Sequence, residues 1–136
     1  MPGHDIIVVG ASAGGRGALK EIVRELPQDL PAAVFVVIHI PAEGTSILPD
    51  ILNRAGSLPA VHPVDGDEIQ RGRIYVAPNN HHLLLIRGYI HLVRGPRENN
   101  VRPAIDPLFR TAARAYGPRG CLKSFIQPLL CSLLIA

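Results

Sequence analysis

Residues 6–15 read Ile6-Ile7-Val8-Val9-Gly10-Ala11-Ser12-Ala13-Gly14-Gly15, and this stretch decides the fold of the chain. Its first four residues are apolar and β-branched, which is typical of a parallel strand buried on both faces. The glycines that follow allow a sharp turn and a close approach of the backbone to other groups. Residues 17–26 then predict an amphipathic helix, whose apolar face comprises Leu19, Ile22, Val23 and Leu26.

Ser12 stands at the centre of a Gly-x-Ser-x-Gly pattern, Gly10 to Gly14. Between a strand and a helix, this pattern predicts a nucleophile elbow that exposes the hydroxyl. Backbone N–H groups at the start of the helix can stabilise a developing oxyanion. The same turn could instead bind a phosphate or a dinucleotide, or have a purely structural role. A dinucleotide site wants an acidic residue about 20 residues further on, whereas the next strand ends at His39.

A second buried strand is predicted over residues 33–38, and it stops at His39-Ile40-Pro41. Strand, helix and strand form a βαβ unit, so the two strands should be parallel, adjacent and connected in the right-handed sense. Their carboxyl ends then meet at one edge of the sheet, where open α/β sheets bind ligands. We therefore expect Ser12 and His39 to lie side by side, with the hydroxyl within hydrogen-bond reach of the ring or slightly beyond.

The remaining pattern indicates an α/β fold with a doubly wound, mostly parallel sheet of the Rossmann-like three-layer type. Further along the chain it predicts a helix over 46–55 capped by Ser46, a short strand within 59–64, a strand over 73–77, an antiparallel hairpin of 82–87 and 89–93, and a helix capped by Asp106 that extends to about 116. The apolar segment 121–136 is broken by Pro128, and we expect a poor amphipathic helix or a disordered end there.

The composition fits one globular domain with its own core, since the chain has 136 residues of which 47% are hydrophobic. The net charge of +3 is scattered without interleaved aromatic residues, which argues against a nucleic-acid partner and could favour an acidic protein surface. Cys121 and Cys131 form neither a zinc-like spacing nor a disulfide framework, so we expect no metal, no cofactor and a cytoplasmic location. We expect neither a signal peptide nor membrane insertion.

Several motifs occur together in chain order. They are the serine stretch at 7–15, Val36-Val37-Ile38-His39-Ile40-Pro41, Asp65-Gly66-Asp67, Tyr75-Val76-Ala77-Pro78, His82, and Arg102-Pro103-Ala104-Ile105-Asp106-Pro107-Leu108-Phe109. In this order they resemble the catalytic domain of the CheB-type protein-glutamate methylesterases of bacterial chemotaxis, over about residues 5 to 120. We accordingly divide the chain into a partial catalytic domain, residues 1–120, and a non-matching apolar tail, residues 121–136.

The resemblance implies a Ser-His-Asp triad that hydrolyses methyl esters on glutamate side chains of chemoreceptors, with deamidation of receptor glutamines in many members. By this resemblance the nucleophile falls on Ser12 and the histidine base on His39. The implied partners are the cytoplasmic domains of methylated chemoreceptors and a receiver domain acting in trans. The alternative is a catalytically silent remnant or a protein-binding module.

Two departures from the family pattern matter. Ala13 stands where the family often has threonine. The family places its triad aspartate in a Gly-Met-Gly-x-Asp-Gly turn after a later strand, whereas residues 121–136 contain no such turn and no carboxylate side chain. We therefore expect impaired hydrolysis and a domain that lacks the family's last strands, through truncation or a frameshift. Without a preceding receiver domain, phosphorylation control in cis is not expected.

Other polar residues are weaker candidates. We expect a packing or surface role, rather than catalysis, for His81 and His82, and a position on the surface of a strand for His62 and His91. Asp65, Asp67 and Asp106 fall in predicted turns or a helix cap, where aspartate is common, so each is a weak replacement for the triad acid. For Arg102 we favour a salt bridge over a contact with an acidic substrate.

Overall fold

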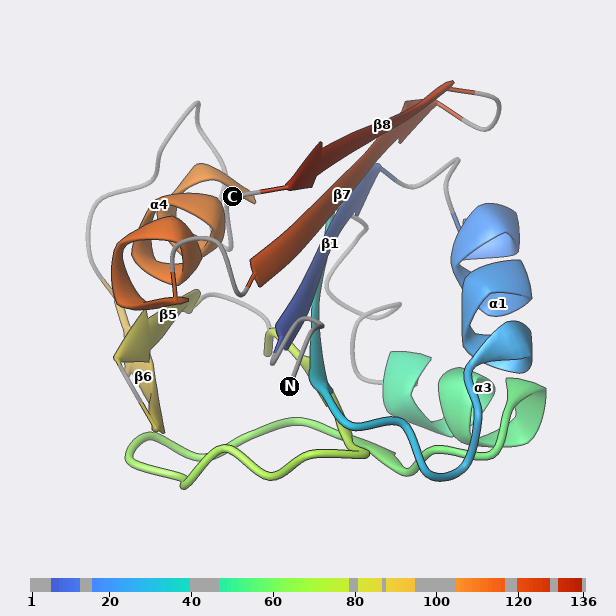
Figure 1. Cartoon of the computed structure of the whole chain (residues 1–136), viewed down its shortest axis with the longest axis horizontal. Coiled ribbons are helices and arrows are strands. Elements are labelled where there is room, and N and C mark those ends of the chain that lie inside the picture. The colour runs from blue at the N-terminus through green and yellow to red at the C-terminus, as the bar shows by residue number, and fades with distance from the viewer. Residues whose placement is uncertain are drawn as a thin grey trace.

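The computed structural model describes residues 6–12, 16–39, 47–78, 81–86, 88–94, 105–116, 120–127 and 130–135. Six strands form one sheet in the order β3-β4-β2-β1-β7-β8 (Figure 1). Only β8 runs antiparallel to its neighbour. The strands are β1 (Ile6–Ser12), β2 (Ala33–His39), β3 (Ala60–Val61), β4 (Ile74–Val76), β7 (Gly120–Gln127) and β8 (Leu130–Ile135).

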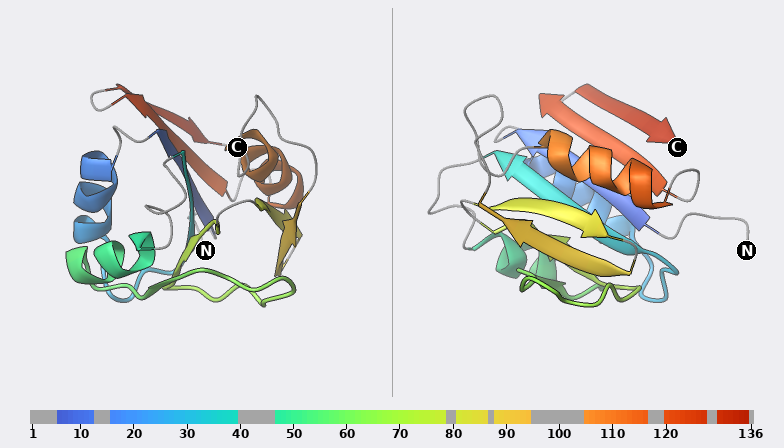
Figure 2. Two further views of the ribbon diagram at one scale, coloured as in Figure 1. Left: turned by 180° about the vertical axis from the view of Figure 1, so that it is seen from behind. Right: turned by 90° about the vertical axis from the view of Figure 1, so that its left-hand side faces the viewer.

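Helices cover both faces of this sheet, so the predicted doubly wound, mostly parallel α/β fold is confirmed (Figures 1 and 2). The helices α1 (Arg16–Glu25) and α3 (Leu48–Ala55) lie on one face. The other face is covered by α4 (Ile105–Tyr116) and by a separate antiparallel hairpin of β5 (His82–Ile86) and β6 (Tyr89–Val93). The predicted hairpin is therefore also confirmed. Among the described helices, none is long and apolar enough to cross a membrane.

Two hydrophobic cores result, one on each face, because successive side chains of a strand point to opposite sides. Val9 and Val36 pack with the helix residues Leu19 and Leu52 on the α1/α3 face. On the other face, residues of β1, β2 and β4 pack with the hairpin and α4; they include Val8, Phe35, Tyr75, Leu83 and Leu108. The central strands are buried on both sides, which explains why their sequences are continuously apolar.

Two predicted helix caps are wrong. The N-cap of α3 is Ile47, which makes no side-chain capping hydrogen bond, and the predicted cap Ser46 lies outside the described residues. Pro49 stands in the first turn of α3, where its missing N–H costs no intrahelical hydrogen bond. The helix α4 begins at Ile105, so Asp106 belongs to its first turn instead of preceding it.

The structure also corrects the expectation for residues 121–136, which was a poor helix or a disordered end. This segment contributes β7 and β8, with β7 parallel to β1 in the register Ile6↔Gly120 to Ala11↔Phe125. The reason is non-local: the edge of β1 that faces away from β2 presents backbone N–H and C=O groups that need partners. An apolar stretch can satisfy them as a strand whatever its own local preference.

The opposite edge of the sheet is protected by a side chain. The amide of Asn53 in α3 donates from Nδ2 to the Ala60 carbonyl oxygen at 3.0 Å, and its Oδ1 accepts from the Ala60 N–H at 2.8 Å. Asn53 thus takes the place of a further strand at Ala60. This arrangement satisfies backbone groups of the edge strand β3 and fastens α3 to the sheet.

Candidate active site at the carboxyl edge of the sheet

Ser12 and His39 meet at the carboxyl edge of the sheet. They are Cα partners and form the last pair in the parallel register between β1 and β2. Backbones of adjacent strands lie roughly 5 Å apart, so the two residues are direct neighbours. The predicted placement of the two residues on neighbouring strands is confirmed for the backbone. The contact between the hydroxyl and the ring stays a prediction.

The strands that carry the pair are rigidly held. β1 lies between β2 and β7, and Val8, Val9, Val36 and Val37 are completely buried just before the two edge residues. Sites built on packed strands are held more precisely than sites built on loops. α1 begins at Arg16, soon after Ser12, as a strand–turn–helix elbow requires. The turn itself, Ala13 to Gly15, and the residues Ile40 and Pro41 lie outside the described residues.

Two of the four weaker histidines contact oxygen atoms of other segments. A ring nitrogen of His62, Nδ1, lies 3.0 Å from the carbonyl oxygen of Val76 in β4. Nδ1 of His91 in β6 lies 3.3 Å from a carboxylate oxygen of Asp65 on the protein surface. His91 therefore lies on the surface of a strand, as expected from the sequence, whereas His62 lies just beyond the end of β3 and its contact with Val76 is part-buried.

His82 differs from these histidines because it is buried. It opens β5 opposite Val93 and is only 3% exposed. The sequence left open a surface or a packing position for His81 and His82. For His82 the burial favours packing, since Leu83 and Leu85 of the same strand are buried as well.

Two weak candidates for the triad acid are occupied elsewhere. Asp65 accepts a hydrogen bond from the Leu92 N–H at 2.8 Å, and Asp67 accepts one from the Val64 N–H at 2.8 Å. Gly66 between them has φ of 90°, a left-handed conformation that favours glycine. These carboxylates therefore shape the turn and hold it against β6, which is the structural role expected for them.

Asp106 lies at the end of α4 that points toward the carboxyl edge. Three residues separate Tyr116 from Gly120, so the C-terminus of α4 is close to the amino end of β7. The first turn of this helix is consequently directed toward the edge where β1 and β2 end. Arg102 lies outside the described residues.

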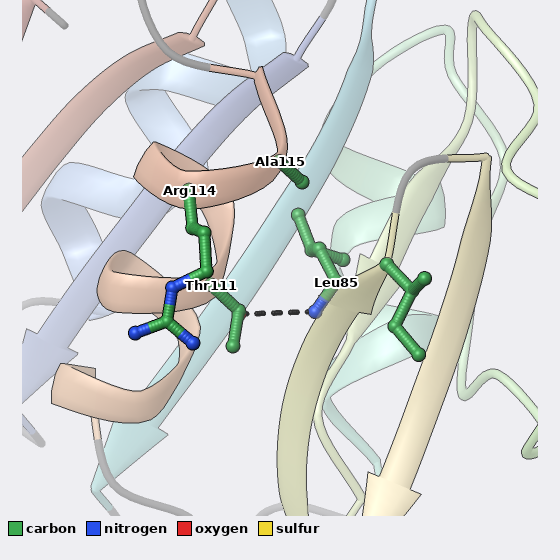
Figure 3. Close-up of a pocket in the computed structure, with 5 residues that line it drawn as sticks. Leu85, Thr111, Arg114 and Ala115 are labelled. Atoms are coloured by element: carbon green, nitrogen blue, oxygen red, sulfur yellow. Dashed lines mark hydrogen bonds between the residues drawn. The ribbon is translucent and has the colours of Figure 1, made fainter.

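A cavity of about 440 Å³ lies elsewhere, between β5 and α4 (Figure 3). Its lining is Leu85, Ile86, Thr111, Arg114 and Ala115. Thr111 connects its two walls: its hydroxyl accepts from the Leu85 N–H at 3.0 Å and donates to the Pro107 carbonyl at 2.8 Å. Because this cavity is formed by the C-terminal half of α4, it belongs to the opposite end of that helix from Asp106.

Comparison with known proteins gives a consistent result. Residues 7–123 match the family model described as CheB methylesterase. The structure superposes on the crystal structure of the Thermotoga maritima CheB methylesterase catalytic domain with a TM-score of 0.81 and 33% sequence identity, covering 88% of this chain and 65% of that one.

Two curated relatives carry the name protein-glutamate methylesterase/protein-glutamine glutaminase. One, from Methanosarcina mazei, is 34% identical over 124 residues, which cover 85% of this chain and 34% of the relative. Another, from Anaeromyxobacter dehalogenans, is 42% identical over 125 residues, which cover 85% of this chain and 35% of the relative. The chain therefore spans about a third of the length of these relatives.

Proposed function

This chain belongs to the CheB methylesterase family, and we propose that it carries the nucleophile and the base of a protein-glutamate methylesterase. One observation carries the proposal: Ser12 and His39 are register partners at the carboxyl ends of adjacent parallel strands. In this proposal Ser12 is the nucleophile and His39 is the general base. In this proposal the catalytic domain comprises residues 1–120, and residues 121–136 are a tail whose described parts belong to β7 and β8.

The reaction would proceed by acyl transfer. The Ser12 oxygen attacks the ester carbonyl carbon while His39 takes the hydroxyl proton, and N–H groups near the start of α1 stabilise the oxyanion. The tetrahedral intermediate collapses as His39 returns the proton to the leaving methoxide, which departs as methanol. Water, activated by the same histidine, then cleaves the acyl-serine to release the glutamate carboxylate. With a glutamine substrate, ammonia is the leaving group.

The proposed substrates are methylated glutamates, and also glutamines, on the cytoplasmic domains of chemoreceptors. The names of the relatives support this substrate class, because they give both a methylesterase and a glutaminase activity. We place the reaction in the cytoplasm, where a receiver domain could act on the chain in trans.

We further propose that hydrolysis by the 136-residue chain is slow. A triad needs a carboxylate that fixes the histidine tautomer and stabilises the imidazolium. Residues 121–136 contain no aspartate or glutamate. Asp65 and Asp67 already accept hydrogen bonds from the backbone N–H groups of Leu92 and Val64, so they are poorly placed to supply it.

A serine-directed fluorophosphonate tests the nucleophile without requiring a full catalytic cycle. We expect labelling of the chain at Ser12, none in Ser12→Ala, and weak labelling in His39→Gln, which lacks the base. Ser57→Ala is the matched control, since Ser57 is an exposed serine between α3 and β3 and should not affect the label. Labelling that persists in Ser12→Ala, or that is lost equally in Ser57→Ala, would refute the assignment.

The second candidate function is a protein-binding module without catalytic activity. The absence of a carboxylate side chain from residues 121–136 favours it. The two are separated by methanol release from methylated receptors combined with the labelling experiment. A chain that binds receptors but shows neither labelling nor methanol release is a binding module.

A further inference from the structure

A groove of about 390 Å³ lies between α1 and α3, on the outer surface of the helices that cover one face of the sheet. Its lining is Lys20, Arg24, Ile51, Arg54 and Ala55. Three of these five residues are cationic, two are apolar, and none is acidic. The groove therefore combines a positive field with an apolar wall contributed by α3.

One of the three cations of this basic groove is paired with a carboxylate. Arg24 pairs with Glu21 at 3.2 Å, but both side chains are about two-thirds exposed (60% and 65%), so solvent weakens their attraction. Within the described part of the chain, Lys20 and Arg54 form no ion pair. Two cations from two different helices are thus available to an anionic ligand.

The width of the groove is set by close packing of the two helices. Gly56, the C-cap of α3, lies against the backbone of Val23 in α1, and a Cβ atom at this position would collide with it. Leu19 and Val23 of α1 share the buried cluster with Leu48 and Leu52 of α3 below the groove. Both walls therefore stand on the folded core, and the cations project from two helices that are packed against each other.

One wall of the groove belongs to α1, the helix that follows Ser12. α1 begins at Arg16, and Lys20 comes one turn later, roughly 6 Å along the helix axis. Arg24 follows one further turn along the same helix. A bound polypeptide whose ester lay at Ser12 could therefore extend along α1 and place neighbouring side chains near Lys20.

We infer that the basic groove binds an acidic segment of the protein substrate, next to the glutamate ester that is hydrolysed. This inference rests on the proposed function. Its chemical reason is that each hydrolysis converts an ester into a glutamate carboxylate, so segments with several such sites carry negative charge. Lys20 and Arg54 would attract these carboxylates, and Ile51 and Ala55 would contact their methylene groups.

A protein segment fits this groove better than a nucleic acid does. Single-stranded nucleic acids are bound along extended basic tracks with aromatic side chains on which bases stack. The groove is short, and no aromatic residue is among the five that line it. The net charge of +3 is also modest.

Peptide binding to the full chain tests the inference. The probes are a fluorescent peptide that contains one glutamate methyl ester flanked by glutamates, and the same peptide with glutamines at the flanks. We use the Ser12→Ala chain, which cannot turn the ester over, and measure fluorescence anisotropy. We expect Lys20→Glu and Arg54→Glu each to weaken binding of the acidic peptide by roughly five- to tenfold, with little effect on the glutamine peptide. Added salt should reduce the difference between the two peptides.

Arg114→Glu is the matched control. Arg114 is exposed on α4, which covers the opposite face of the sheet, and the substitution changes the net charge by the same amount. Unchanged binding by Lys20→Glu and Arg54→Glu, or an equal loss in Arg114→Glu, overturns the inference. Tighter binding of an oligonucleotide of equal charge also overturns it. If a charge reversal prevents folding, Lys20→Gln and Arg54→Gln replace it. We then expect a smaller loss of affinity for the acidic peptide.

The peptide-binding test can fail independently of the test of the proposed function. Fluorophosphonate labelling of the unsubstituted chain tests Ser12, whereas peptide binding is measured without that hydroxyl. A chain that is not labelled but binds the acidic peptide through Lys20 retains the docking surface and loses the esterase assignment. A chain that is labelled but binds both peptides equally loses only the docking surface.

Discussion

Ser12 and His39 occupy the same register position on two adjacent parallel strands, as the final pair of β1 and β2. Val8 and Val9 of β1 and Val36 and Val37 of β2 are buried in the two cores, so packing on both faces of the sheet holds the two strands in this pairing. The packing that builds the two cores therefore also keeps the serine beside the histidine. The proposed chemistry consequently depends on the packing of strands whose other residues take no part in it.

Restoring a triad carboxylate should restore hydrolysis. We expect the 136-residue chain to release methanol from methylated receptors far more slowly than a chain in which residues 121–136 are replaced by the corresponding C-terminal segment of a relative. In serine proteases, neutralising the triad aspartate lowers kcat by about 10⁴, and a loss of at least that order is expected here. Equal rates for the two chains would contradict the argument from the missing carboxylate. Asp106→Asn is then the first substitution to examine, since Asp106 lies in the first turn of α4.

Removing the hydroxyl of Tyr75 should destabilise the fold. Tyr75 is 1% exposed and stacks on Phe35 with ring centroids 5.2 Å apart, while its hydroxyl accepts from the Gln70 N–H at 3.0 Å. Tyr75→Phe leaves that N–H without its acceptor, so we expect a loss of about 1–2 kcal/mol in the free energy of unfolding. Urea denaturation measures it. Tyr89→Phe is the control, since Tyr89 is 54% exposed and its substitution should change stability by less than about 0.5 kcal/mol.

Thr111 should couple α4 to the hairpin through its hydroxyl. In Thr111→Val the Leu85 N–H loses its acceptor while the shape of the side chain is kept, so we expect a loss of about 1–2 kcal/mol. Thr111→Ser keeps the hydroxyl and should retain most of the stability. Hydrogen exchange at the Leu85 amide gives a second readout, because it should accelerate in the valine variant and remain slow in the serine variant. Equal exchange in both variants would show that the hydrogen bond does not connect these elements.

Substitution by alanine should have opposite effects on stability at two glycines. Gly66 has φ of 90° in the turn between Asp65 and Asp67, so Gly66→Ala should cost about 1 kcal/mol through backbone strain. Gly17 lies in the first turn of α1, where a Cβ atom would meet nothing within 4 Å, so Gly17→Ala should stabilise by about 0.5–1 kcal/mol. Thermal unfolding of the two variants should therefore bracket the Tm of the parent chain. Stabilisation by both would contradict the strained turn.

Much of the fold follows from local patterns in the sequence. The apolar period of residues 17–26 and the second apolar run at 33–38 predict α1 and β2 to within one residue of each end, and the β-branched run before Gly10 predicts the start of β1, which continues through Gly10 to Ser12. The hairpin β5–β6 and the helix α4 are predicted equally well. These elements have strong periodicity and clear boundaries, so their type depends little on distant contacts.

Other features are invisible to local reasoning because they depend on partners far along the chain. Asn53 bonds to Ala60, Thr111 bonds to Leu85, and the start of α3 uses no side-chain cap although Ser46 precedes it. No sequence pattern marks an asparagine that will lie beside an unpaired strand edge. The basic groove is likewise formed by two helices whose contact could be located only after both had packed on the sheet.

The sequence by itself determined that Ser12 and His39 would share one edge of the sheet. A strand, a helix and a strand in succession form a βαβ unit, in which the two strands are parallel. The carboxyl ends of neighbouring parallel strands meet at one edge of the sheet. Only the tertiary structure decided that residues 120–127 and 130–135 form β7 and β8. Their own preference was ambiguous, and the unpaired backbone groups of β1, more than a hundred residues earlier in the chain, determined their conformation.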